Sequence, residues 1–142
     1  METRKPLWIQ ASEDPAMVVL PTLLAARQVA YLLVADAHIR YPRGRSQIAY
    51  IGTTYTGFWR LASSTAERAS RILRQPGVNS FRVVPVRAEP RRGLKTWELL
   101  EKSLLAAFRE RYGRLPKCNK RGGSFSQHFA ASDVSEILQQ FE

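Results

Sequence analysis

The sequence predicts a small α/β domain of the α+β type, with a three-stranded, mainly antiparallel sheet flanked by helices. Three observations support this class: two strand-like apolar runs early in the chain, two longer segments with helical periodicity, and a strand-like run between those helices. The chain has 142 residues, 44% of them hydrophobic, which is enough for one packed core. We therefore expect one domain with short extensions at both ends.

The first two strands are expected to form a β-hairpin. Residues 29–36 are rich in β-forming residues and make the first predicted strand, and residues 47–53 make the second. The polar, basic residues 40–47 are expected to form a long loop between them. Residues 21–27 could form a short preceding helix, with a proline in its first turn.

Two long helices, a third strand and a last short helix follow the hairpin. Residues 57–74 and 94–112 carry apolar side chains at helical spacing, which predicts the two long helices. Residues 78–87 predict the third strand, and Pro85 favours an edge position because proline cannot donate to a sheet ladder. Residues 133–141 are expected to form the last, short helix.

The composition favours a nucleic-acid partner. The chain has 22 Lys and Arg against 12 Asp and Glu, a net charge of +10, and most of the bases are arginine, which binds phosphate through planar, bidentate contacts. Cys118 is the single cysteine, so an intrachain disulfide and a cysteine-rich zinc site are excluded, as suits a reducing cytoplasm. No apolar stretch approaches the ~20 residues that cross a bilayer, so we expect no membrane partner and a cytoplasmic location.

The candidate contacts to nucleic acid are basic residues of the first long helix and of a later loop. They are Arg68, Arg71, Arg74, Lys117, Lys120 and Arg121. Phosphate contacts of this kind would make binding salt-dependent without base specificity, and a solvated basic surface is the alternative for each residue. Trp59 is expected to pack against the first strand, with stacking on a nucleobase as the alternative.

Glu101 has an unusual position on the longest predicted helix. At ~100° per residue it lies ~40° from Trp97, inside the apolar stripe that also contains Phe108. A buried carboxylate without a partner costs several kcal/mol. We therefore expect Glu101 to have a partner, which is either a cation of the protein, such as Arg60, or a metal ion in a cleft.

A set of polar and aromatic residues stands near the ends of the predicted elements. The set comprises Tyr31 on the first strand, Tyr50 and Gly52 on the second, Arg60 at the start of the first long helix, Glu101 on the longest helix and Asn119 in the loop after it. The order and spacing of this set resemble the GIY-YIG endonuclease family. The resemblance covers residues 29–123 as a nuclease-like domain, with an N-terminal extension at 1–28 and a C-terminal extension with a short helix at 124–142.

The two halves of the family's name motif match unequally. Tyr50-Ile51-Gly52 reproduces the second half, whereas Val29-Ala30-Tyr31 has Val29 and Ala30 in place of Gly-Ile. One turn after Arg60, where the family often has His or Tyr, this chain has Ser64. These departures leave open whether such a site is active.

The resemblance implies a divalent-metal-dependent endonuclease that hydrolyses DNA phosphodiester bonds by a one-metal mechanism. Glu101 would bind Mg²⁺ or Mn²⁺, Arg60 would hold the phosphate, and Asn119 would brace the site. Tyr31 would be the general base, with Tyr50 beside the attacking water. The alternatives are a catalytically inactive nucleic-acid-binding module of the same fold and a basic structural protein of a ribonucleoprotein, for which RNA replaces DNA. A separate partner protein could supply targeting.

Overall fold

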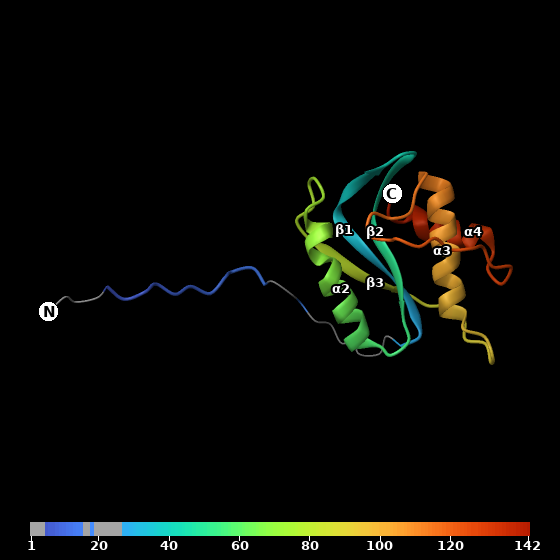
Figure 1. Cartoon of the computed structure of the whole chain (residues 1–142), viewed down its shortest axis with the longest axis horizontal. Helices are drawn as coiled ribbons and strands as arrows, with labels where there is room; N and C mark the ends of the chain where they lie inside the picture. Colours follow the sequence, from blue (N-terminus) through green and yellow to red (C-terminus); the bar gives the residue numbers. More distant parts are fainter. Residues whose placement is uncertain (1–4, 16–17, 19–26) are drawn as a thin grey trace.

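A three-stranded antiparallel sheet, in the order β2-β1-β3, forms the centre of the protein. The computed structural model in Figure 1 describes residues 5–15, 18 and 27–142. Its elements are β1 (Val29–Tyr41), β2 (Gly44–Thr54), α2 (Phe58–Leu73), β3 (Phe81–Val86), α3 (Thr96–Tyr112) and α4 (Ala131–Gln139). The predicted α+β class, with antiparallel strands flanked by helices, is confirmed. The short helix expected at residues 21–27 lies, except for Arg27, outside the described residues.

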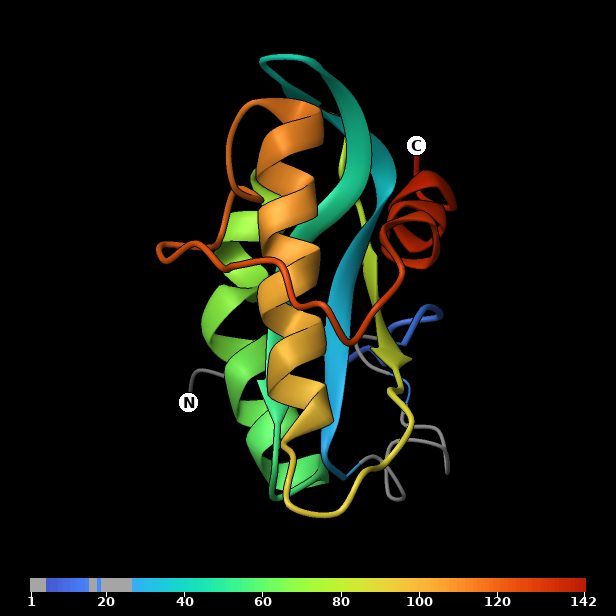
Figure 2. The same ribbon diagram turned by 90° about the vertical axis from the view of Figure 1, so that its right-hand side faces the viewer.

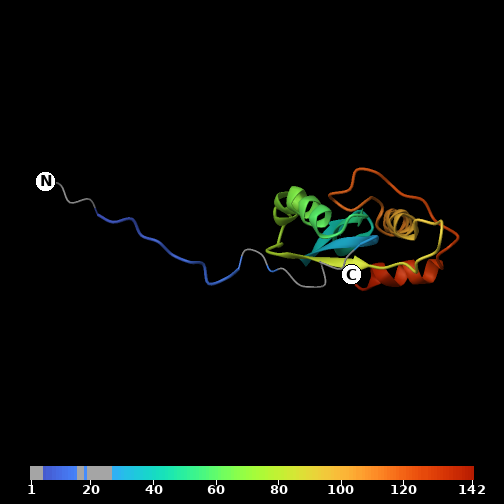
Figure 3. The same ribbon diagram turned by 90° about the horizontal axis from the view of Figure 1, so that it is seen from below.

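The first half of the central strand, β1, is covered on both faces. Every residue from Val29 to Ala35 is at most 3% exposed, and side chains alternate across a strand, so consecutive burial requires cover on both sides. Figures 2 and 3 show α2 and α3 against one face of the sheet and α4 against the other. Tyr31, in the middle of this run, is 1% exposed as a result.

The β1–β2 hairpin is longer and more tightly connected than expected. The long loop predicted at residues 40–47 is wrong, because β1 continues to Tyr41 and only two residues separate it from β2. The Tyr41 ring packs edge-on against Phe108 of α3, with 5.0 Å between ring centroids. The N–H of Arg43 at the tip donates to the carbonyl of Tyr112 at 3.0 Å. The hairpin tip is therefore ordered by the end of α3.

The other elements lie close to their predicted ranges. α2 and α3 begin and end within two residues of the expected positions. β3 pairs with β1 alone among the named strands, so Pro85 lies on an edge strand, as predicted, and is exposed. α4 begins at Ala131 and adds Val134 and Leu138 to the same core as the sheet. Within the described residues, none of the helices has both the length and the apolar character to cross a membrane.

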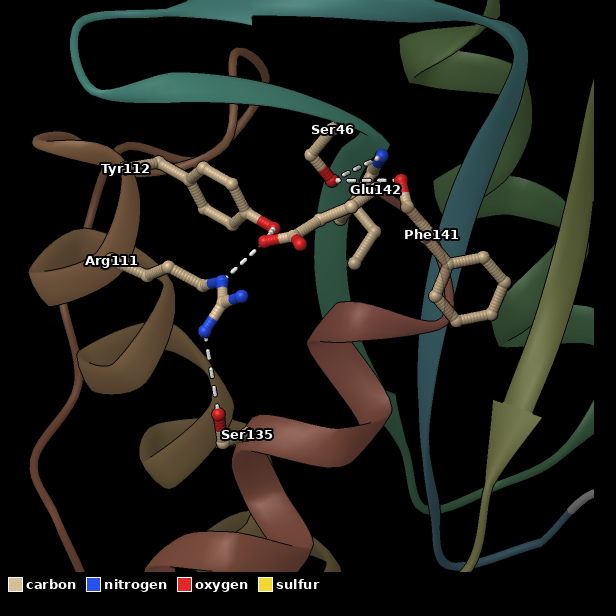
Figure 4. A network of polar contacts seen from close by, with 7 residues as sticks. Ser46, Arg111, Tyr112, Ser135, Phe141 and Glu142 are labelled. Atoms are coloured by element: carbon tan, nitrogen blue, oxygen red, sulfur yellow. Dashed lines mark hydrogen bonds and ion pairs between the residues drawn. The ribbon is translucent and has the colours of Figure 1, made fainter.

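A polar clasp joins the C-terminal segment to β2 and α3 (Figure 4). The β1–β2 ladder is irregular at Gln47, whose N–H donates instead to the carbonyl of Phe141 at 2.8 Å. The hydroxyl of Tyr112 donates to a carboxylate oxygen of Glu142 at 2.7 Å, and Arg111 forms an ion pair with the same oxygen. The clasp holds α4 against the sheet at the end opposite to the first turns of α2 and α3.

We predict that Phe108→Ala lowers the free energy of unfolding by about 3–5 kcal/mol, because it empties a fully buried site between two tyrosine rings. Phe125→Ala is the matched control, since Phe125 is 59% exposed, and it should change stability by less than about 0.5 kcal/mol. Urea unfolding of both variants measures the difference. Equal losses in the two variants would contradict this packing.

Candidate functional site

An open pocket of about 590 Å³ lies over β2, between α2, α3 and the loop after α3. Three of the predicted catalytic residues and four of the predicted nucleic-acid contacts line it. They are Tyr50, Glu101 and Asn119 from the first set and Arg68, Arg71, Lys120 and Arg121 from the second. The fold thus brings together residues from four separate segments of the chain.

Tyr31 and Tyr50 converge above Gly52. Their ring centroids are 5.9 Å apart and the ring planes are tilted by 47°. A Cβ atom on Gly52 would lie 2.6 Å from the Tyr50 ring and 2.7 Å from the Cζ and hydroxyl oxygen of Tyr31. Such distances are far inside van der Waals contact, so any side chain at this position would displace both rings. Glycine is required here by the close approach of two phenols.

Ser64 and Arg68 of α2 complete this cluster. The Tyr31 hydroxyl and Ser64 Oγ form a 2.5 Å hydrogen bond, and Nη1 of Arg68 donates to the same Ser64 oxygen at 2.9 Å. The Cζ atom of Arg68 also lies 4.0 Å from the centroid of the Tyr50 ring, which is a cation–π arrangement. One guanidinium therefore acts on both tyrosines, directly on Tyr50 and through a serine hydroxyl on Tyr31.

The surroundings of Tyr31 keep its phenol protonated. Burial raises the pKa of Tyr31 to about 12; the hydrogen bond with Ser64 and the charge of Arg68 act against the rise, and Tyr50 adds to it. With the protein groups alone, the phenol is neutral at pH 7. To act as a base at this pH, Tyr31 needs another cation close by.

Glu101 lies at the edge of the buried face of α3 and faces the pocket. Burial raises the pKa of its carboxyl group; a hydrogen bond from Thr53 opposes the rise, and the charge of Glu98 adds to it. The salt bridge to Arg60 that the sequence allowed is not among the ion pairs of the described residues, which are Arg68–Glu67 and Arg111–Glu142. Among the described residues the carboxylate is thus partly desolvated and outside any ion pair, and the charge of Lys102 lowers its pKa without contacting it as an ion-pair partner.

Asn119 fixes the loop after α3 to the backbone of β2. Its Oδ1 accepts a hydrogen bond from the N–H of Ile51 at 2.9 Å, and its Nδ2 donates to the carbonyl of Ile51 at 2.8 Å. One residue earlier, the N–H of Cys118 donates to the carbonyl of Ala49 at 3.0 Å. The asparagine thereby takes the place of a neighbouring strand at this edge of the sheet and positions one wall of the pocket.

Arg60 lies apart from the tyrosine cluster. It is exposed in the first turn of α2 and is not among the residues that line the pocket. Arg68, two turns later on the same helix face and ~12 Å further along the axis, lies beside Tyr50 instead. The helical spacing of Arg60, Ser64 and Arg68 was visible in the sequence. It did not indicate which arginine faces the tyrosines, and it gave no sign that Ser64 contacts Tyr31.

Three further candidates lie outside the pocket. Arg74 caps the C-terminal end of α2 and is exposed. The Nζ atom of Lys117 lies 5.6 Å from the centroid of the Tyr41 ring, near the hairpin. Trp59 is 81% exposed, so the prediction that it packs against the first strand is wrong.

The oxygen ligands at the pocket suit a metal ion that is bound jointly by the protein and by a substrate phosphate. In the described part of the chain, no group of three His, Cys, Asp or Glu side chains is placed to hold a metal ion. Mg²⁺ commonly binds through one or two carboxylates together with substrate phosphates and water. Glu101 supplies one hard oxygen at the pocket, and the basic residues around it favour a phosphate there.

Comparison with protein-family models, with curated proteins and with solved structures gives no match to this chain.

We predict that Gly52→Ala lowers the free energy of unfolding by about 1–3 kcal/mol, the usual cost of overpacking, because the new methyl group overlaps both tyrosine rings. Gly122→Ala is the matched control, since a Cβ at that position meets its nearest neighbour at an ordinary 3.5 Å. Urea unfolding and the near-UV circular dichroism of the tyrosines measure the two effects. Unchanged stability and spectrum in Gly52→Ala would show that the rings do not meet above this residue.

We also predict that Glu101→Gln stabilises the protein at pH 8 and has little effect at pH 4. Because the folded pKa of Glu101 is raised, folding favours the protonated carboxyl group, and stability is lost as the pH rises through the folded pKa. Glutamine resembles the protonated form at every pH and avoids this loss. Urea midpoints at the two pH values test the sign, with exposed Glu110→Gln as the control. A destabilised Glu101→Gln at pH 8 would refute it.

Proposed function

We propose that the pocket binds the phosphate backbone of DNA and that the protein is a divalent-metal-dependent endonuclease. The observation that carries this proposal is the meeting of a partly desolvated carboxylate, Glu101, with Arg68 in one basic pocket, where Arg68 is linked through the Ser64 hydroxyl to the buried phenol of Tyr31 behind the pocket wall. The order of strands and helices and the matched motif residues are consistent with the GIY-YIG resemblance, which remains part of the proposal.

The basic residues of the pocket would hold the substrate. Arg71, Lys120 and Arg121 line it from two sides and carry the charge needed for neighbouring phosphates. Arg68 uses Nη1 on Ser64 and keeps other guanidinium N–H groups for an oxygen of the scissile phosphate. This would place developing negative charge on phosphorus beside a fixed cation.

Tyr31 would take the proton of the attacking water. Its phenol must first lose its own proton, and Ser64 can then donate a hydrogen bond to the phenolate while accepting one from Arg68. Through this chain of hydrogen bonds, the positive charge of Arg68 would stabilise the phenolate of Tyr31 without contacting it directly. Tyr50, held under the guanidinium of Arg68, would confine the water from the other side.

Glu101 would hold the metal ion, with Thr53 orienting the carboxylate through its hydroxyl group. A bound Mg²⁺ or Mn²⁺ supplies positive charge that polarises phosphate oxygens and lowers the pKa of neighbouring groups. Asn119 would keep the wall of the pocket fixed while substrate enters. Glu67 of α2 also lines the pocket but forms an ion pair with Arg68, so Glu101 is the pocket carboxylate left for a metal ion among the described residues, which favours one metal ion over two.

We predict that the protein nicks supercoiled plasmid or branched DNA with Mg²⁺ or Mn²⁺ and that Glu101→Ala reduces the rate by about a hundredfold or more, the scale on which a lost transition-state contact acts. Glu110→Ala, an exposed carboxylate of the same helix, is the matched control and should cut at the wild-type rate. Gel assays with and without a chelator measure both. Intact DNA with the wild type, or undiminished cutting by Glu101→Ala, contradicts the proposal.

A binding module without chemistry is the second candidate. The pKa of Tyr31, about 12, favours it, because the protein groups alone do not prepare this phenol to act as a base. In that case the wild type binds nucleic acid in a salt-sensitive manner and gives no product with any divalent metal. A preference for RNA over DNA in a binding competition would favour a ribonucleoprotein role for the same surface.

A further inference from the structure

β2 ends and α2 and α3 begin at the same end of the domain (Figures 1 and 2). Three large aromatic residues, Tyr55, Trp59 and Trp97, belong to these segments. Tyr55 is 63% exposed and Trp59 is 81% exposed, and Trp97 is half-buried. The rings of Tyr55 and Trp97 are 5.9 Å apart with an interplanar angle of 35°. We call Tyr55, Trp59 and Trp97 the aromatic patch. Large aromatic side chains with this much exposed surface at one end of a domain are typical of a binding surface.

The aromatic patch borders the Glu101 side of the pocket. Trp97 lies one helical turn before Glu101, ~6 Å along the axis of α3. On the other side, Tyr55 follows Thr53 by two residues, and Thr53 donates a hydrogen bond to the Glu101 carboxylate. A polymer whose phosphate lies at Glu101 therefore brings its next groups onto these rings.

The charges around the aromatic patch favour nucleic acid over a protein partner. Arg60 follows Trp59 in the first turn of α2, Lys95 precedes Trp97 by two residues, and both cations are exposed; Glu98 is the acidic neighbour. Rings interleaved with cations are suited to a single strand, because the rings stack on bases while the cations contact phosphates. A paired base inside a duplex has both faces covered by its neighbours and offers no face to these rings. The feature therefore selects an unpaired base.

We propose that the aromatic patch stacks on an unpaired nucleobase, and that the substrate class of the neighbouring pocket is nucleic acid with a single-stranded segment next to a duplex. The exposed rings of Tyr55 and Trp59 make the stacking contact, and Arg60, which is too far along α2 to serve Tyr50, contacts a phosphate of the unpaired strand. This inference rests on the proposed function of the pocket and adds to it the form of the substrate.

The test is equilibrium binding by fluorescence anisotropy, in a chelator so that no cleavage occurs. Three labelled probes share one DNA duplex: one is blunt, one has an overhang of about five nucleotides, and one has the same overhang without bases. We expect the wild type to bind the base-bearing overhang about tenfold more tightly than either of the others, as stacking of one or two bases gives. Equal affinity for the base-bearing and abasic overhangs would overturn the proposal, since phosphates alone would then explain binding.

Variants separate stacking from a general loss of structure. The double variant Tyr55→Ala, Trp59→Ala should bind all three probes with the affinity that the wild type has for the blunt duplex. Tyr55→Phe keeps the ring and should keep the preference, and Phe125→Ala removes an equally exposed ring elsewhere and should also keep it. A preference for the base-bearing overhang that persists in the double variant overturns the proposal. If the aromatic patch binds a protein instead, either the preference persists in the double variant or the wild type shows no preference.

Cleavage assays with Mg²⁺ or Mn²⁺ distinguish this inference from the proposed function. If the DNA stays intact and the protein strongly prefers the overhang, the proposed endonuclease activity is contradicted and the stacking role is kept. If the protein cuts blunt and overhang duplexes alike and binds them without preference, the stacking role is contradicted and the proposed endonuclease activity is kept.

Discussion

The burial of β1 on both faces is the constraint on which the rest of the structure depends. From Val29 to Ala35 the strand is covered by α2 and α3 on one side and by α4 on the other, so this part of it has no exposed position for a polar side chain. The phenol of Tyr31 must therefore find its partner inside the domain, and it finds the hydroxyl of Ser64. That hydroxyl in turn fixes Arg68 above the ring of Tyr50, and Gly52 leaves the space in which the two rings meet.

The pocket shows a conflict between stability and chemistry. Glu101 is partly desolvated, and no ion pair of the described residues includes it, so its ionised form weakens the folded state at neutral pH. Asn119 uses both hydrogen-bonding groups of its side-chain amide on the backbone of Ile51, which holds the edge of β2 in place. Costs of this kind concentrate where a protein binds or transforms a ligand, because a ligand can supply the missing partner.

Much of the fold and part of the site could be predicted because they depend on neighbours in the sequence. The helices α2 and α3 follow from apolar spacing, and the edge position of β3 follows from Pro85. Tyr50, Glu101 and Asn119 were identified from spacing and do line one pocket. The role of Ser64 could not be predicted, because a serine on a helix face has many partners available until the helix is placed on the sheet.

The sequence by itself determined the class of fold, the order of its elements and most residues of the pocket, since periodicity and strand or helix preference are local properties. Tertiary structure alone decided the length of the hairpin, because Tyr41 is held by Phe108 on a distant helix. It also decided that Arg68, rather than Arg60, lies over the Tyr50 ring, and that most of the Trp59 side chain is exposed. Both outcomes depend on where α2 crosses the sheet, which is set by the packing of the whole core rather than by any segment of the chain.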